Sequence, residues 1–551
     1  MSNTVQPRYR GHLFSKVPHT SIERSSFDRS SGYLTTLDGG YLVPIMVDEA
    51  LPGDTFNMQA YKQVCRMTTP IAPFMGNVKA RVFFFSIPKR LLWTNFEAFI
   101  TGGQDPDDPT KFNTYLYPEI EIPKASLVNG SIFDYMGIPT NISGDSLTVN
   151  ALPLRAYNLV WNEWFRDENL QARVPCSKAD GGDQITDFTL LKRGRRHDYF
   201  SSALPWPQKG PAVDLPLGDI APVVGTGKAL GLSDGTNNLG FETPTTTANA
   251  YPALGTANYD KDVGAAGGYG GAALSKVLGL TTDAEKSGAV VDLSSATAAS
   301  INEFRQAFQL QRLFERDARG GSRYVETLLA HFKTRSPDAR LQRPEYLGGG
   351  EIPFAVQSVA QTSSTDNTTP QGNLAAVATG NDISGKIRWT KSFTEHCIVL
   401  GLICIYTDSE HIYQQGLNRL WSRRTRFDEF WPVLARLGEQ AVYNRELYAM
   451  GTADDAGVFG YQERYAEYRY KPSMITGKMR SNDANSLDVW HLAPYFSQLP
   501  TLGSDFIEED PAFDRVIAVQ NEPQFLLDCW FDLKCTRPMP LYGVPGYADH
   551  F

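Results

Sequence analysis

The stretch QFLLDCWFDLKC, residues 524–535, decides the fold class of this chain. Every second side chain from Phe525 to Cys535 is apolar, whereas Asp528, Asp532 and Lys534 lie at positions between them. Successive side chains of a strand point to opposite faces of a sheet, so this alternation predicts a β-strand with one buried face.

Two further stretches predict strands far from the first one. Residues 77–87, NVKARVFFFSI, alternate until Pro88 ends the run. Residues 396–406, HCIVLGLICIY, form an almost continuous apolar run that is typical of a strand covered on both faces. Because these strands are widely separated along the chain, their neighbours must come from distant segments, as in Greek-key sandwiches and jelly rolls. The sequence therefore predicts a mainly β protein.

Helices are fewer. Residues 301–319 and 322–333 carry apolar side chains at helical spacing. Their apolar stripes indicate core or interface packing rather than a cofactor site.

The bulk composition indicates a globular protein with large contacts. Of 551 residues, 42% are apolar, 12% aromatic and 21% charged. Aromatic side chains suit a β-rich core and also supply buried area between subunits. The net charge of −9 excludes condensation of nucleic acid by charge alone, so any DNA contact must be local.

The sequence predicts a soluble protein made in a cytoplasm. No apolar run has the length of a transmembrane helix, and the N-terminal residues lack the apolar core of a signal peptide, so we expect no insertion into a membrane. The six cysteines contain no CxxC pair, which predicts free and mostly buried thiols in a reducing compartment.

Arginine usage divides the chain. Residues 221–300 contain no arginine and are rich in Gly, Ala, Thr, Ser and Asn, whereas residues 301–345 contain eight arginines. This contrast predicts a weakly constrained surface insertion at 221–300, between two parts of one body at 1–220 and 301–551. Long surface loops on a rigid scaffold usually present a recognition surface.

No motif predicts catalysis. Residues 268–273 formally fit a dinucleotide-binding pattern, but they lie in low-complexity sequence with no strand before them. No GxSxG nucleophile motif and no compact metal-ligand spacing occurs. We expect a protein that is not an enzyme and that needs no cofactor or metal.

Three clusters carry the candidate contact residues. Residues 192–197, KRGRRH, form a cationic turn, and residues 421–427, WSRRTRF, interleave arginines with aromatics, which suits stacking on bases plus phosphate contact. Residues 161–166, WNEWFR, form the third cluster. Arginine and tryptophan are also enriched at protein–protein contacts, which favours a subunit interface over single-stranded DNA and leaves both open. The candidates are Trp161, Trp164, Arg166, Arg193, Arg195, Arg196, Trp421, Arg423, Arg424 and Arg426.

Longer motifs run in order along the whole chain. They include PKRLLW at 88–93, WNEWFRDEN at 161–169, DYFSSALPW at 198–206, FRQAFQLQRLFERDARGGSR at 304–323, SPDARLQRPEYLGGG at 336–350, FGYQERYAEYR at 459–469 and RPMPLYGVPG at 537–546. Together they resemble the major capsid proteins of the Microviridae, small single-stranded DNA phages, in the gokushovirus branch.

The resemblance implies an eight-stranded antiparallel jelly roll with long inter-strand loops. It also implies self-assembly into a T=1 icosahedral shell in the bacterial host cytoplasm, around a circular single-stranded DNA genome that contacts the inner surface. A small basic DNA-binding viral protein and a minor capsid or pilot protein are implied partners. The family carries its variable insertion, a threefold protrusion, at 221–300. There we expect a loop that recognises a host-surface receptor, with Tyr259, Gly264, Gly267 and Tyr269 as candidates.

Two other classes fit an aromatic-rich and loop-rich β protein. One is a carbohydrate-binding or carbohydrate-cleaving protein, which would show a concave aromatic cleft with a pair of carboxylates. The other is a phage attachment or scaffold protein that associates without closing a shell.

Overall fold

The computed structural model describes residues 23–101, 115–211, 213, 301–321, 323–335, 337–338, 342–360 and 374–542, and the short segments 223–225, 232–233, 238–239, 279–280 and 289–291. The chain divides into two compact units. One combines Met1–Lys209 with Glu315–Phe551, and the other is Gly210–Phe314. All sites described below lie in the first unit.

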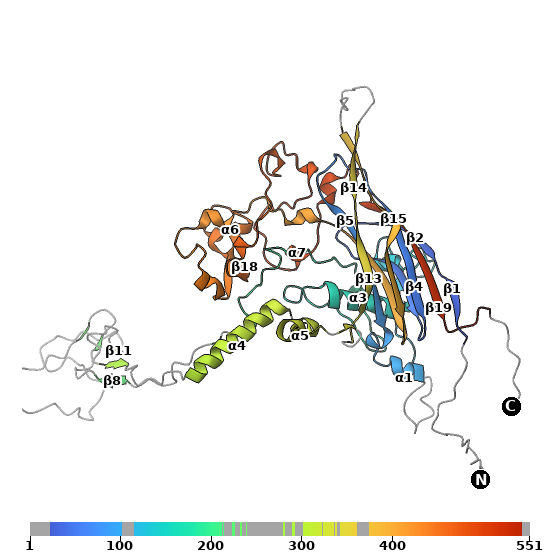
Figure 1. Cartoon of the computed structure of the whole chain (residues 1–551), viewed down its shortest axis with the longest axis horizontal. Coiled ribbons are helices and arrows are strands. Elements are labelled where there is room, and N and C mark those ends of the chain that lie inside the picture. Colours follow the sequence, from blue (N-terminus) through green and yellow to red (C-terminus); the bar gives the residue numbers. More distant parts are fainter. Residues whose placement is uncertain are drawn as a thin grey trace, which may run out of the picture. The chain divides into compact units, whose positions relative to one another are not determined.

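Two antiparallel sheets form the centre of the first unit (Figure 1). The six-stranded sheet has the order β1-β19-β4-β15-β14, and β2 also pairs with β19. Its strands are β1 (Ser25–Asp28), β2 (Ser31–Leu37), β4 (Thr55–Met67), β14 (Ala355–Ala360), β15 (Leu374–Ser392) and β19 (Phe525–Arg537). The four-stranded sheet has the order β13-β5-β16-β3 and consists of β3 (Val43–Ala50), β5 (Val78–Pro88), β13 (Glu345–Pro353) and β16 (Cys397–Thr407).

The sheets pack face to face through the alternating side chains that the sequence predicts. The inward side chains of β19 are buried, and its Phe531 ring lies 5.5 Å from the Tyr61 ring of β4 and 6.4 Å from the Phe84 ring of β5. Every residue of β16 is buried. One face of β16 joins the core between the sheets, and Leu400, Leu402 and Cys404 join a second apolar cluster with the helix at 152–160. The prediction of a strand covered on both faces is therefore confirmed.

The strand order is that of a jelly roll. Along the chain, β2, β4 and β19 enter one sheet, and β3, β5 and β16 enter the other. The prediction of a mainly β antiparallel fold is confirmed. The number eight depends on how strands are counted. The two sheets hold ten strands, but β1 and β2 lie end to end along β19, and β14 continues β13 beyond the buried Phe354.

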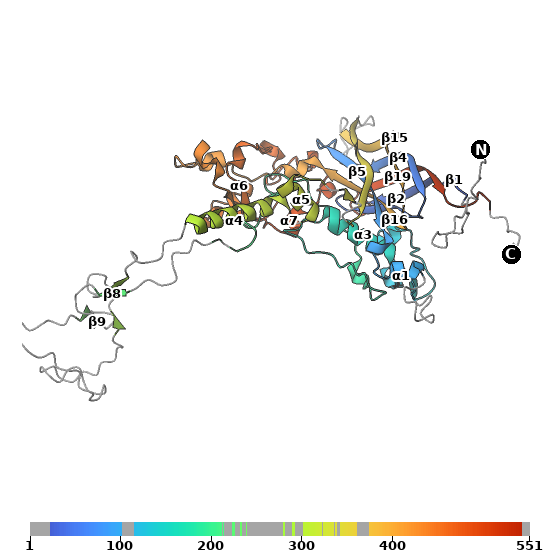
Figure 2. The same ribbon diagram turned by 60° about the horizontal axis from the view of Figure 1, so that its bottom comes forward.

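One helix, α3, packs against the four-stranded sheet. Figures 1 and 2 show α3 beside the four-stranded sheet, and its C-terminal end continues into a π-helical turn at Trp161–Phe165. The helices predicted at 301–319 and 322–333 are confirmed as α4 and α5. The helices are α1 (Phe96–Thr101), α2 (Ile132–Tyr135), α3 (Leu152–Val160), α4 (Ile301–Gly320), α5 (Tyr324–Phe332), α6 (Asn444–Leu447), α7 (Ser504–Ile507) and α8 (Phe513–Val516).

Smaller strand pairs lie outside the two sheets. In the first unit they are β6 (Glu119–Pro123) with β7 (Ser146–Asn150), and β17 (Glu439–Tyr443) with β18 (Val458–Glu463). In the second unit, β8 (Val223–Gly225) pairs with β12 (Ala289–Val291), and β9 (Leu232–Ser233) pairs with both β10 (Asn238–Leu239) and β11 (Gly279–Leu280).

Most of the predicted insertion at 221–300 lies outside the described residues, as do its candidates Tyr259, Gly264, Gly267 and Tyr269. Its boundaries stay a prediction.

Five of the six thiols are buried, as predicted, and burial raises the pKa of Cys65 and of Cys529 to about 12. Among the described residues, no helix has both the length and the apolar character needed to cross a membrane.

Candidate functional sites

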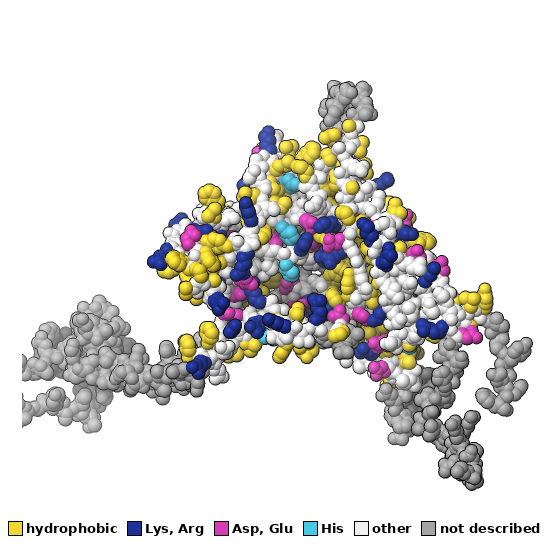
Figure 3. Space-filling model, in the orientation of Figure 1, with side chains coloured by type: hydrophobic (Ala, Val, Ile, Leu, Met, Phe, Trp, Pro, Cys, Tyr) yellow, Lys and Arg dark blue, Asp and Glu magenta, His cyan; other side chains and the backbone are white. Residues whose placement is uncertain are grey.

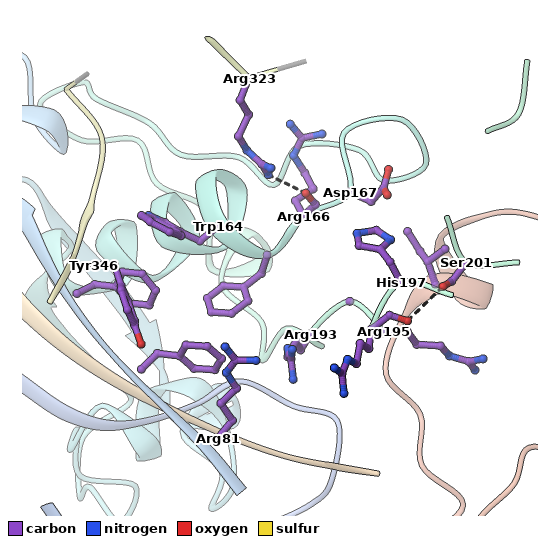
Figure 4. Close-up of a pocket in the computed structure, with 16 residues that line it drawn as sticks. Arg81, Trp164, Arg166, Asp167, Arg193, Arg195, His197, Ser201, Arg323 and Tyr346 are labelled. Atoms are coloured by element: carbon purple, nitrogen blue, oxygen red, sulfur yellow. Dashed lines mark hydrogen bonds between the residues drawn. The ribbon is translucent and has the colours of Figure 1, made fainter. Parts of the chain in front are cut away.

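A cavity of about 450 Å³ gathers residues from two of the three predicted clusters (Figure 4). The cationic turn contributes Arg193, Arg195 and Arg196, and the segment after α3 contributes Trp164 and Arg166. Figure 4 shows Trp164 and Tyr346 side by side at one end, with arginines along two sides. We call this hollow the arginine cavity.

The lining of the arginine cavity is strongly cationic. It contains six arginines and one histidine but a single carboxylate, Asp167. That carboxylate already accepts hydrogen bonds from the backbone N–H groups of Asn169 (2.8 Å) and Leu170 (3.1 Å). The low dielectric of a partly enclosed site strengthens this excess of positive charge toward an anion.

Two arginines of the arginine cavity, Arg193 and Arg166, have no carboxylate within 4.0 Å of the guanidinium among the residues that the structure describes. Arg193 instead lies over the ring of Tyr406 at 4.8 Å, and its Nη1 atom is buried without a hydrogen bond. Burial and the neighbouring Arg323 lower the pKa of Arg166 below its ordinary value. A bound anion would give the Arg193 Nη1 atom a hydrogen-bond acceptor and would stabilise the charged form of Arg166.

The other cations of the cavity are partly neutralised. Arg81 pairs with Glu351 at 3.0 Å, and Arg196 lies 3.6 Å from Asp408. Arg323 pairs with Glu168 at 2.9 Å, and it also donates to the carbonyl of Arg166 at 2.7 Å, which fixes the position of that segment.

One wall of the arginine cavity is aromatic. The Phe85 ring lies 5.4 Å from Trp164 and 5.6 Å from Tyr346, and the Phe83 ring lies 5.1 Å from Phe165. Flat rings beside guanidinium groups suit a ligand that carries both phosphates and bases. A second hollow of about 420 Å³ shares Arg166, His197 and Arg323 with the first, but its lining also includes the carboxylates Asp167, Glu168 and Glu326.

Backbone contacts fix the cationic turn. The Arg193 N–H donates to the carbonyl of Gly40 at 2.9 Å, and the Glu509 N–H donates to the carbonyl of Arg193 at 2.8 Å. Gly40 has φ +84°, and a Cβ atom there would lie 2.4 Å from the Glu509 carbonyl oxygen. Only glycine fits at this crossing of three segments.

Asp198 anchors the end of the turn. Its carboxylate accepts hydrogen bonds from the N–H groups of Phe200 (3.0 Å) and Ser201 (2.6 Å) and from the hydroxyl of Tyr413 (2.9 Å). Burial opposes the charged form, but hydrogen bonds from His411 and Ser201 outweigh it and lower the pKa of Asp198. An ionised Asp198 therefore holds the turn in place.

The third predicted cluster lies apart, in residues 420–437. Here the guanidinium of Arg423 lies 4.3 Å from the Tyr468 ring centre, and that of Arg426 lies 5.2 Å from the Trp431 ring centre. Arg424 is exposed, and Trp421 exposes 77% of its surface. We call this the 420–437 segment.

Trp161 belongs to neither surface. It is only 5% exposed, it packs in the cluster behind β16, and its Nε1 donates to the carbonyl of Lys192 at 2.9 Å. Its position next to the cationic turn is structural.

The sequence interpretation missed Arg81, Arg323 and Tyr346, which also line the arginine cavity. A signal for Arg81 exists, because Arg81, Phe83 and Phe85 alternate along β5 and therefore share one sheet face. Arg323 and Tyr346 come from distant segments, so no local pattern could place them there.

The comparisons with known proteins agree over nearly the full length. The sequence profile of the family described as "Capsid protein (F protein)" matches residues 15–547. The chain is 45% identical over 548 residues to capsid protein VP1 of Bdellovibrio phage phiMH2K, covering 99% of each chain. It is 42% identical to capsid protein VP1 of Chlamydia phage 1 and 35% identical to that of Spiroplasma virus 4, covering 98% of each chain in both cases. The resemblance to the Microviridae proteins is confirmed, and this chain belongs to the capsid protein (F protein) family, the structural shell proteins of small single-stranded DNA phages.

Proposed function

We propose that copies of this chain close a T=1 icosahedral shell around a circular single-stranded DNA genome, and that the arginine cavity contacts this genome from inside. The observation that carries the genome contact is the pair Arg193 and Arg166. Within the described part of the chain neither cation has a carboxylate partner, and both stand beside a wall of aromatic rings, which is the chemistry of single-strand binding.

The acidic balance of the chain supports a local contact rather than general charge neutralisation. With a net charge of −9, the protein repels DNA at long range, so a concentrated cationic hollow is needed to hold a strand. A separate small basic viral protein would then neutralise most of the genome. A minor capsid or pilot protein completes the proposed virion, which is assembled in the host cytoplasm.

Size-exclusion chromatography followed by negative-stain microscopy of the expressed chain tests the shell. We expect closed particles of one diameter, with a copy number by native mass spectrometry that matches T=1. A chain that elutes only as a discrete monomer or small oligomer contradicts the shell.

Ultraviolet cross-linking of genome-filled particles, followed by peptide mass spectrometry, tests the contact. We expect DNA adducts on the peptides that carry Phe83, Trp164 and Tyr346. Peptides of the 420–437 segment serve as the internal control, because they are equally aromatic. Adducts on the control peptides alone contradict the assignment of the cavity.

The insertion at 221–300 is proposed to face outward and to recognise a host-surface receptor. Its composition supports this role, since a long Gly- and Ala-rich loop tolerates change better than the sheets do. A particle that lacks residues 221–300 should assemble but fail to adsorb to the host. If particles with and without residues 221–300 adsorb equally well, the insertion does not recognise the receptor.

A further inference from the structure

The 420–437 segment exposes seven large apolar side chains. Val433 exposes 88% of its surface, and Trp421 exposes 77%. Figure 3 shows hydrophobic side chains gathered over the part of the molecule where Figure 1 labels α6 and β18. Contiguous apolar patches of this kind mark protein contacts. The exposed apolar side chains of the segment are Leu420, Trp421, Phe427, Phe430, Trp431, Val433 and Leu437.

Internal hydrogen bonds hold these side chains outward. The Asp428 carboxylate accepts from the backbone N–H groups of Arg424 (2.9 Å) and Thr425 (2.8 Å). The Trp431 indole donates to the carbonyl of Arg426 at 2.7 Å, and the Trp431 N–H donates to the Tyr465 hydroxyl at 3.2 Å. The segment is therefore preorganised, and binding there loses little conformational entropy.

The charge of the segment is opposite to that of the rest of the chain. Residues 420–437 contain four arginines and two carboxylates, a net charge of +2, whereas the whole chain carries −9. The remaining residues therefore carry −11. A second copy of this chain is thus net acidic outside the segment, which favours its approach to the cationic segment.

A small hollow beside Trp421 favours a protein over a nucleic acid. It measures about 250 Å³ and is lined by Tyr199, Phe200, Tyr470 and Met474. Its carboxylates Glu446 and Glu467 lie 3.2 Å and 3.7 Å from Arg419 of the same lining, so the hollow, with Arg480 as its other arginine, offers no excess of positive charge to a phosphate. An apolar side chain of another protein fits such a hole as an anchor.

We infer that the 420–437 segment is the docking surface for a second copy of this chain, and that Trp421 and Phe427 are its main contacts. The inference rests on the proposed shell, because it names one of the contacts that would close it. The partner copy offers an acidic surface and places an apolar side chain near the hollow beside Trp421.

Sedimentation velocity of the purified double variant Trp421→Ser, Phe427→Ser tests the inference against the unchanged chain. We expect the fraction of protein in particles to fall at least about tenfold, because hot-spot aromatic residues dominate contact free energies. The control is Leu34→Ser on β2, since Leu34 is 80% exposed and lies on a different surface. Particle yields equal to those of the unchanged chain overturn the inference. Normal yields with loss of packaged DNA also overturn it, because the surface would then bind nucleic acid.

Two further readouts separate folding and shell closure from docking. Circular dichroism melting should be unchanged in the double variant, and if it is not, Val433→Glu replaces it as a single exposed change that repels an acidic partner. Should the unchanged chain form only small open oligomers that the variant loses, the docking surface stands and the closed shell does not. A chain that stays monomeric under all conditions overturns both.

Discussion

The arginine cavity and the 420–437 segment have nearly the same composition and opposite shapes. In the cavity, arginines surround a hollow, and two of them lack a carboxylate partner among the described residues. In the 420–437 segment, Arg423 lies 3.6 Å from the Glu429 carboxylate, and large apolar side chains are exposed around the arginines. The difference shows that an arginine–aromatic motif does not specify its ligand. The partners that the fold gives each guanidinium decide whether an anion or a protein surface fits.

The largest expected effect is on the free energy of unfolding, and it distinguishes the buried Trp161 from the exposed Trp421. Trp161→Ala should lower the free energy of unfolding by about 3–5 kcal/mol, because it leaves a cavity in the cluster behind β16. Trp421→Ala should change it by less than about 0.5 kcal/mol, since that side chain is exposed. Urea unfolding of the unassembled chain measures both values. Similar losses for the two variants would show that the two regions do not differ in this way.

The second effect concerns DNA. Arg193→Gln with Arg166→Gln should weaken binding of a single-stranded oligonucleotide roughly tenfold, and the slope of log K against log salt should shrink by about 1.4, or 0.7 for each lost phosphate contact. Fluorescence anisotropy at several salt concentrations measures this slope. Arg424→Gln with Arg426→Gln is the matched control and should leave the slope unchanged. If the control variant lost more DNA affinity than the Arg193 and Arg166 variant, the 420–437 segment rather than the arginine cavity would be the DNA contact.

The third effect depends on pH. Asp198→Asn should cost about 1.5–3 kcal/mol near pH 5, because it weakens charge-assisted hydrogen bonds that hold the cationic turn. The pKa of Asp198 is lowered from 3.8 in the folded chain, so its contribution is present above pH 3.8 and is lost as pH falls through the lower folded value. Thermal melts at about pH 5 and about pH 3 should therefore show the gap between the unchanged chain and the variant shrinking. A stability difference that grows as the pH falls would contradict the lowered pKa of Asp198.

The smallest effect tests the ion pair of the 420–437 segment. Arg423 and Glu429 lie 3.6 Å apart, and the Glu429 side chain is exposed. A double-mutant cycle with Arg423→Gln and Glu429→Gln should give a coupling free energy below about 1 kcal/mol, as for other exposed pairs. A much stronger coupling would mean that this pair, rather than the hydrogen bonds of Asp428, fixes the shape of the segment.

The sequence predicts the strands well because their signal is local. The alternation in residues 524–535 and the continuous apolar run in 396–406 each follow from burial of one or two sheet faces, and both strands form as predicted. The helices at α4 and α5 follow from helical spacing for the same reason.

The arginine cavity is only half visible in the sequence. The turn at 192–197 and the cluster at 161–166 stand out by composition, but their meeting depends on Gly40, Glu509 and Arg323, which lie far away along the chain. The local pattern gives Trp161 and Trp164 the same predicted role. In the structure Trp161 is buried in the core, whereas Trp164 lines the cavity. Only tertiary packing determines which tryptophan reaches the cavity.

The position of β19 makes completion of the fold depend on contacts between distant parts of the chain. This strand lies between β4 and the β1–β2 edge, yet it follows all three of these strands far along the sequence. Until Phe525–Arg537 joins its sheet, β4 lacks a neighbour on that side and the core lacks the inward side chains of β19. Because the long loop between these partners must close before their contacts form, we expect the jelly roll to fold slowly.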